Sequence, residues 1–124
     1  MDCDLAVLEV LRTARTHSYI EPPTLTGPQM RAALAAGLIV ATPLPGSTAD
    51  LRRHESVPYS LMASADSRAK AKAALRDALA ALDEARGRSL NFVDVSETPA
   101  PIPSGRDGIW SFQCTVTASV RARA

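Results

Sequence analysis

The C-terminal third of the chain constrains the fold most, because a long helical pattern there is followed by a long alternating pattern. Between Asp66 and Arg86, apolar residues recur at helical spacing while charged residues take the other faces. The apolar members of this pattern are Ala71, Leu75, Ala78, Leu79 and Leu82. From Trp110 to Ala122 every second residue is apolar, and the residues between them are polar. The two patterns predict a helix with one buried face and a strand with one face in water.

The N-terminal part of the chain predicts two helices joined by a loop. Asp4 is placed to cap the first helix, which carries several leucines and valines. Residues 18–28 are rich in proline and cannot extend either neighbouring helix, so we expect a connecting loop there. A second, short helix is expected to open at Thr26 or Gly27 and to stop at Gly37.

Strand character follows in four segments of the chain. These are Leu38–Thr42, Val57–Ser64, Leu90–Val95 and Trp110–Ala122. The stretches Pro43–His54 and Thr98–Gly108 are rich in turn-forming residues, so we expect both to be exposed loops. Pro58 has no N–H to donate to a ladder, which predicts that its strand, or at least the start of it, lies at a sheet edge.

Together these elements predict one α+β domain over residues 1–124, with a helical part at 1–37 and a sheet with the long helix at 38–124. The expected sheet is four-stranded and mainly antiparallel, with the long helix packed on one face. In this arrangement the helix stripe Leu75, Leu79 and Leu82 packs against Trp110, Phe112 and Val116. The opposite, polar face of the final strand meets either water or another subunit, and the sequence leaves both open.

Composition excludes some classes of function. The formal net charge is +1, with 14 basic and 13 acidic residues, which gives no strong field for steering nucleic acid or anionic membranes. Aromatic residues make up 4%, so base stacking is not the expected activity. Acidic residues stand at the N-terminus and no apolar run approaches membrane-spanning length, so we expect a soluble protein made in the cytoplasm. Cys3 and Cys114 are far apart in sequence and no disulfide is expected between them.

Residues that could carry chemistry are few, and none forms a known catalytic arrangement. His17 and His54 fall in predicted loops with no carboxylate or cysteine at metal-ligand spacing. Cys114 lies mid-strand on the apolar face, away from any activating base. The sequence therefore predicts no catalytic residues, no metal site and no cofactor, and we do not expect an enzyme.

The remaining charged and glycine-containing motifs have ordinary structural interpretations. The acidic pairs Asp83 with Glu84 and Asp94 with Glu97 are expected on solvated surfaces. Neither Gly46 nor the turn Gly105–Gly108 has the spacing of a phosphate-binding loop. The basic residues Arg52, Arg53, His54, Arg121 and Arg123 are not interleaved with aromatics and are expected to be solvated.

The order of elements nevertheless resembles a known family. It consists of the run from Leu38 to Gly46, a polar loop, a strand through Tyr59 and Leu61, the Ala-rich helix, a further strand, the Pro-rich segment Thr98–Pro103, the turn Gly105–Gly108 and the strand Trp110–Arg121. In this order, residues 38–124 resemble the tail-terminator or minor tail proteins of long-tailed bacteriophages. The Pro-rich loop and extra helix between Tyr19 and Gly37 depart from the usual pattern.

The resemblance implies a structural virion protein without chemistry of its own. Its implied partners are copies of itself in a homohexameric ring, the major tail tube protein that the ring caps, and a head-completion or connector protein. DNA would pass through such a ring without specific binding, and no membrane is involved. The implied location is the head–tail junction of the virion, after assembly in the host cytoplasm. Because exposed loops often carry contacts, we expect Pro43–His54 to meet neighbouring subunits and Pro99–Asp107 to make contacts along the tail axis.

Two other functions remain open on the sequence. The first is a head-completion or connector protein of the same virion, which would share the small size and the absence of catalytic residues. The second is a small non-enzymatic binding module that uses its sheet and the Leu44–His54 loop, although no convergent polar groups for a ligand are visible in the sequence.

Overall fold

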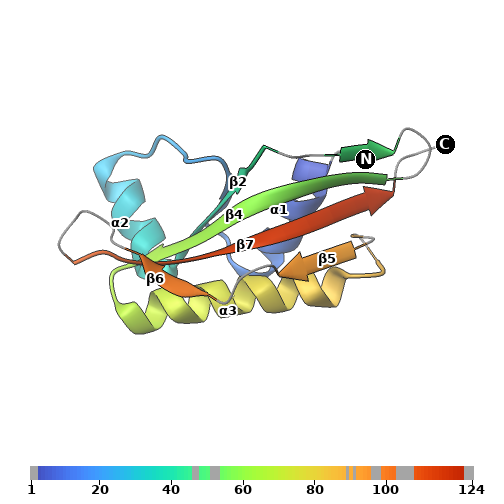
Figure 1. Cartoon of the computed structure of the whole chain (residues 1–124). Coiled ribbons are helices and arrows are strands. Elements are labelled where there is room, and N and C mark those ends of the chain that lie inside the picture. The colour runs from blue at the N-terminus through green and yellow to red at the C-terminus, as the bar shows by residue number, and fades with distance from the viewer. Residues whose placement is uncertain are drawn as a thin grey trace.

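Two long antiparallel strands, β4 (His54–Ala65) and β7 (Trp110–Arg121), form the centre of the fold. They pair along their whole length, from His54 opposite Arg121 to Ala65 opposite Trp110 (Figure 1). The computed structural model describes residues 3–45, 48–50, 54–88, 90, 92–95, 99–102 and 108–121. Both segments place an apolar residue at every second position over most of the paired region, strictly so in β7, whereas Pro58 and Met62 stand among the intervening residues of β4.

Shorter strands flank this central pair on both sides. Next to β4 lie β2 (Leu38–Pro43) and β3 (Thr48–Asp50), both antiparallel to it, and β1 (Ser18–Ile20) pairs in parallel with β2. Next to β7 lie β5 (Phe92–Val95) and β6 (Ala100–Ile102), which pair with different parts of it. The described strands thus form one seven-stranded mixed sheet.

The predicted four-stranded, mainly antiparallel sheet is therefore wrong, although the class is α+β. The three strands that the prediction lacks, β1, β3 and β6, are each three residues long and lie in segments expected to be loops. Such short strands have no readable alternation, and they form because a long neighbouring strand offers its backbone groups for pairing.

Pro58 lies inside β4, between other strands, so the prediction of an edge position is also wrong. Its carbonyl accepts a hydrogen bond from the Leu44 N–H at 2.8 Å, and the nitrogen of a strand residue is directed to the same side as its carbonyl. On that side β2 pairs with β4 only as far as Tyr59, and β3 only as far as Ser56. The missing N–H therefore falls in the break between two flanking strands.

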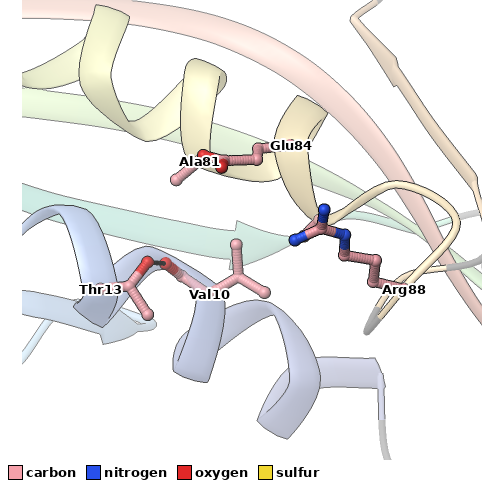
Figure 2. Close-up of a pocket in the computed structure, with 6 residues that line it drawn as sticks. Val10, Thr13, Ala81, Glu84 and Arg88 are labelled. Carbon is pink, nitrogen blue, oxygen red and sulfur yellow. Dashed lines mark hydrogen bonds between the residues drawn. The ribbon is translucent and has the colours of Figure 1, made fainter.

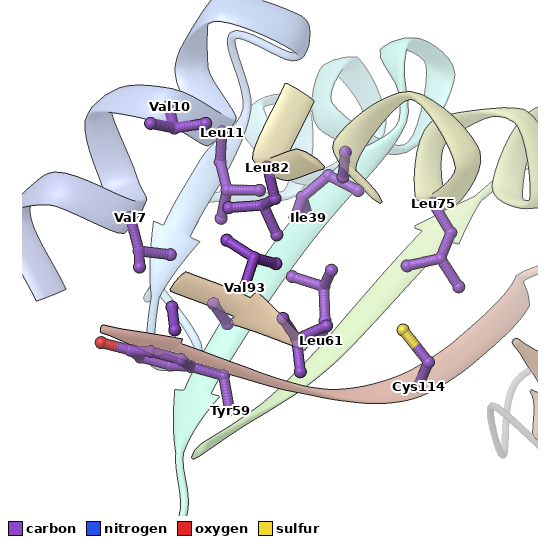
Figure 3. Close-up of a cluster of buried hydrophobic side chains, with 14 of the residues drawn as sticks. Val7, Val10, Leu11, Ile39, Tyr59, Leu61, Leu75, Leu82, Val93 and Cys114 are labelled. Carbon is purple, nitrogen blue, oxygen red and sulfur yellow. The ribbon is translucent and has the colours of Figure 1, made fainter. Parts of the chain in front are cut away.

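Helices α1 (Cys3–Ala14) and α3 (Arg68–Ala85) cover one face of the sheet and enclose the main core. Ser67 caps α3, its hydroxyl accepting from the Lys70 N–H at 3.2 Å. Figure 3 shows side chains from both helices pointing down onto those of the strands, with Leu75 above Cys114. The largest fully buried side chains include Leu11, Ile39, Tyr59, Leu61, Leu75, Leu82 and Leu90.

The predicted contact of the long helix with the final strand holds for Phe112 and Val116, which are buried, but not for Trp110. Trp110 is 49% exposed because it pairs with Ala65 at the very end of the two long strands, beyond the cover of α3. Alternation assigns a residue to a face of the sheet but does not say where the helix above that face begins.

Helix α2 (Gly27–Ala36) forms as predicted and lies on the opposite face of the sheet at one end. Thr26 caps it in a capping box, with the Gln29 N–H donating to the Thr26 hydroxyl and the Thr26 N–H donating to the Gln29 side chain. Gly37 ends it with φ of 97°, a conformation that favours glycine. A small second core forms beneath α2 from Ala33, Leu38 and Val40, with Tyr19, Leu25 and Met30 packed against it.

Candidate interaction surface

The face of the sheet away from α1 and α3 is mostly polar, although Ser64, Ser111 and Ser119 on it are buried. Here the central strands present mostly short, uncharged side chains, because β4 and β7 alternate in register and direct their apolar residues to the core. We call this surface the polar sheet face; its members are Ser56, Pro58, Ser60, Met62, Ser64, Ser111, Gln113, Thr115, Thr117 and Ser119. For this face, the sequence leaves two alternatives: contact with water or contact with another subunit.

Hydrogen bonds across the polar sheet face hold its side chains in place. The hydroxyls of Ser64 and Ser111, which lie opposite each other, are 2.8 Å apart. The Gln113 side-chain amide donates to the Ser60 hydroxyl at 2.6 Å. Cross-strand pairs of this kind stabilise a sheet and keep its polar side chains close to the backbone. The face therefore offers fixed hydroxyls rather than long mobile charges.

A shallow hollow of about 220 Å³ lies where α2 meets the polar sheet face. It is lined by Met30, Leu34, Leu38, Met62, Ser64, Ile109 and Ser111. The two serine hydroxyls at its floor already bond to each other, and the other lining side chains are apolar. The hollow thus suits an apolar side chain of another protein better than a polar ligand.

A second hollow of about 280 Å³ lies between α1 and α3. In Figure 2, Val10 and Thr13 of α1 face Ala81 and Glu84 of α3, and the Arg88 guanidinium points into the space between the helices. The Thr13 hydroxyl donates to the Val10 carbonyl at 2.6 Å, so it is engaged within its own helix.

The only titratable group with a clearly shifted pKa is structural, within the part of the chain that the structure describes. Tyr59 is 1% exposed, and its hydroxyl donates to the Asp4 carboxylate across the contact between α1 and β4. Burial, and then the hydrogen bond to Asp4, raise the pKa of Tyr59 well above its ordinary value. In Figure 3 its ring lies among the core side chains, with the hydroxyl at the edge of the cluster.

The residues that the sequence set aside as non-catalytic are not brought together. His17 is half-buried, and no group of His, Cys, Asp or Glu side chains able to hold a metal exists among the described residues. The Asp83 carboxylate lies 3.6 Å from the Arg86 guanidinium in an exposed ion pair, which agrees with the predicted solvated surface. Cys3 and Cys114 are both buried in the core, and the Cys3 thiol donates to the Ala118 carbonyl at 3.5 Å.

The two loops expected to make contacts are only partly described. Within Pro43–His54 the structure shows that residues 48–50 are strand β3, and within Pro99–Asp107 that residues 100–102 are strand β6. The expectation of fully irregular loops is wrong at these positions, because both segments pair with the long strands. Several residues named in the sequence analysis lie outside the described part: Gly46, Arg52, Arg53, Glu97, Thr98, Pro103, Gly105, Asp107, Ala122 and Arg123.

The sequence did not identify the hollow beneath α2 or the hydrogen-bonded pairs on the polar sheet face. Alternation predicted that Ser111 and Gln113 share a face, but their partners depend on the register between β4 and β7. No local signal fixes that register, because the two strands are separated in sequence by α3, β5 and β6.

None of the described helices is both long enough and apolar enough to cross a membrane. No protein-family model matches the sequence. No curated protein matches it either. The fold is similar to that of a chain in the solved structure "Virion of native gene transfer agent (GTA) particle", with a TM-score of 0.56 and 14% sequence identity. The likeness covers 94% of this chain and 84% of that one, so it extends over the N-terminal helices as well as the sheet.

Proposed function

We propose that this chain is a structural protein of a phage-like virion, and specifically a tail terminator. In this role it forms an oligomeric ring that caps the tail tube and joins it to the head-completion proteins. The observation that carries the proposal is the likeness of the fold, over 94% of the chain, to a chain of a gene transfer agent virion. The order of elements from Leu38 onward supports the narrower role, because it resembles that of tail terminators.

The surfaces of the molecule support a function based on contacts between proteins. The polar sheet face is built from short side chains fixed by hydrogen bonds, so little side-chain entropy is lost when a second protein covers it. Strands β1 and β3 on one side of the sheet and strands β5 and β6 on the other are the outermost described strands. Their outer backbone groups can pair with a strand from a neighbouring subunit.

The hollows weaken the alternative of a small-molecule binding module. Their volumes are about 280 and 220 Å³, below the roughly 300 Å³ at which ligand sites begin. In the hollow beneath α2, the two polar lining side chains, Ser64 and Ser111, already bond to each other. The small formal net charge of +1 also agrees with a ring through which DNA passes without being held.

The proposal is tested first by the mass of the purified protein in solution, measured by native mass spectrometry and by light scattering. A ring of about six subunits is expected, because the resemblance to tail terminators implies a homohexameric ring. A monomer at high concentration that also fails to bind isolated tail tubes contradicts the proposal.

A substitution on the polar sheet face locates the contact. Thr117 is half-buried on β7, so Thr117→Arg places a long charged side chain on this face without entering the core. We expect the variant to fold but to lose ring formation or tube binding. Thr24→Arg, at an exposed position before α2, is the matched control and should assemble normally. Equal assembly of both variants would rule out the polar sheet face as the subunit contact.

Binding of the protein to isolated heads but not to tail tubes would instead favour a head-completion role. The two roles differ in which purified particle the protein pulls down, so the same preparation decides between them.

A further inference from the structure

Helix α3 carries a line of three basic side chains that form no ion pair with any other described residue. Arg68, Lys72 and Arg76 are spaced four residues apart, so they lie above one another on one face, and all three are exposed. Within the described residues none of the three takes part in an ion pair, whereas Lys70 on the same helix pairs with Asp66 at 2.9 Å. We call Arg68, Lys72 and Arg76 the basic stripe.

The first residue of the basic stripe opposes the electrostatics of its own helix. Arg68 stands in the first turn of α3, at the positive end of the helix dipole, and no acidic residue stands in that turn. Positive charge there costs stability, since the dipole favours anions at this end; Lys72 and Arg76 lie in later turns, where this effect has fallen off. A negatively charged partner beside the stripe would offset the cost at Arg68.

An apolar groove of about 140 Å³ runs beside the basic stripe. It is lined by Lys72, Leu75, Arg76, Leu79, Pro99 and Phe112. It lies on the side of α3 that faces β6 and the start of β7, which Figure 1 shows running close to the helix. Arg68 extends the positive rim, with its guanidinium carbon 5.8 Å from the centre of the Phe112 ring.

The size and lining of the groove define what it can hold. A volume of about 140 Å³ is well below the roughly 300 Å³ of small-molecule sites, and matches a single apolar side chain. Lys72 and Arg76 stand at its rim, where they would meet carboxylates next to that side chain. The Phe112 ring is buried beneath the groove, so it offers no platform on which a nucleic-acid base could stack.

We propose that the groove between α3 and β6 binds an acidic peptide segment of a partner protein, with one apolar residue of the segment seated between Lys72 and Arg76. The positive charge of the basic stripe favours segments with acidic residues. The apolar lining of the groove holds the apolar residue of the segment. The proposal goes beyond the tail-terminator role and does not depend on it, because it concerns a different face of the molecule from the polar sheet face.

The test is fluorescence anisotropy with a labelled peptide, Gly-Asp-Glu-Leu-Glu-Asp-Gly, titrated with the full chain at low salt. We expect saturable binding that weakens as salt is added. Replacing the central Leu of the peptide by Ser, or reversing two charges with the double variant Lys72→Glu and Arg76→Glu, should each weaken binding by about tenfold or more. Leu79→Trp, which fills the groove and keeps the charges, should weaken it similarly.

The matched control is the double variant Arg31→Glu and Arg88→Glu, which makes the same change in net charge at exposed positions outside the groove. It should alter peptide affinity by no more than about twofold. Circular dichroism confirms that each variant is folded.

Four results would overturn the proposal. The first is no peptide binding at concentrations up to about 1 mM. The second is an equal loss of peptide binding in the groove and control variants. The third is equal binding of a single-stranded oligonucleotide of matched charge, which would make the stripe a general anion surface. The fourth is that the double variant at Lys72 and Arg76 dissociates an oligomer of this chain, which would make the groove a contact between copies.

Discussion

The Tyr59 hydroxyl affects stability in two ways: it donates a hydrogen bond to Asp4, and its pKa is higher in the folded state than in the unfolded chain. The variant Tyr59→Phe separates the two effects. The phenol is 1% exposed and donates to the Asp4 carboxylate, tying α1 to the central strand β4. Tyr59→Phe removes the hydroxyl and keeps the ring that fills the core. At neutral pH we expect the free energy of unfolding to fall by about 1.5 kcal/mol, the lower end for a bond to a charged group, because Asp4 is half-buried and recovers water.

At high pH, the effect of Tyr59→Phe on the free energy of unfolding is expected to reverse its sign. Burial and the bond to Asp4 raise the pKa of Tyr59 in the folded state above its value of about 10 in the unfolded chain. The contribution of the neutral phenol to stability is complete below pH 10, and it is lost above it because only the unfolded state releases the proton. The wild-type protein should lose about 1.4 kcal/mol per pH unit from this group, and Tyr59→Phe should lose none of it.

The two proteins should therefore become equally stable near about pH 11, where the loss of about 1.4 kcal/mol per unit has cancelled the neutral difference of about 1.5 kcal/mol. The measurement is urea unfolding of both proteins followed by circular dichroism between pH 7 and pH 11.5. Other groups that titrate in alkali affect both proteins alike and cancel in the difference. A difference in stability that stays constant across this range would show that Tyr59 ionises in the folded state, and would refute the reasoning.

Three further substitutions test the packing of the helices by chemical denaturation. Leu82→Ala, at a side chain 1% exposed between α3 and the sheet, should lower the free energy of unfolding by about 2–5 kcal/mol, and a cost below about 1 kcal/mol would mean that the site is not core. Thr26→Ala removes the capping box of α2 and should cost about 1 kcal/mol, whereas Thr26→Asn should keep most of the stability. Arg15→Ala should cost about 1 kcal/mol, because the guanidinium donates to the Ala36 carbonyl at the end of α2 and pairs with Asp77 of α3; an unchanged stability would show that these contacts are not formed in solution.

The long elements of the fold were predictable because their patterns are long. The helix between Asp66 and Arg86 and the strand beginning at Trp110 each repeat one period many times, and both form close to the predicted bounds. The second helix was predictable for a different reason, since Thr26 and Gly37 are strong signals for its two ends.

The short strands and the edge assignment could not be predicted from local patterns. Strand β1 at Ser18–Ile20 exists because β2 offers it an edge, and nothing within those three residues requires it. Pro58 was predicted at a sheet edge because proline has no N–H to donate to a neighbouring strand. This requirement applies only to the one side of β4 to which the Pro58 nitrogen is directed. A break between β2 and β3 satisfies it inside the sheet.

The polar sheet face was predictable as a face, but its details were not. Alternation placed Ser111 and Gln113 on one side of the strand, whereas their bonds to Ser64 and Ser60 depend on a long-range register. Arg68, Lys72 and Arg76 of the basic stripe are visible in the sequence at four-residue spacing, among the charged residues assigned to faces of the helix other than the apolar one. The apolar groove beside it arises only when Pro99 and Phe112 are brought against α3.

The central claim, that this chain caps a tail tube, is tested most directly by electron microscopy of isolated tail tubes incubated with the gold-labelled protein. Label at a single end of each tube is the predicted result, with Thr117→Arg reducing it and Thr24→Arg leaving it unchanged. Label spread along the length of the tubes, or no label on any tube, would contradict the claim.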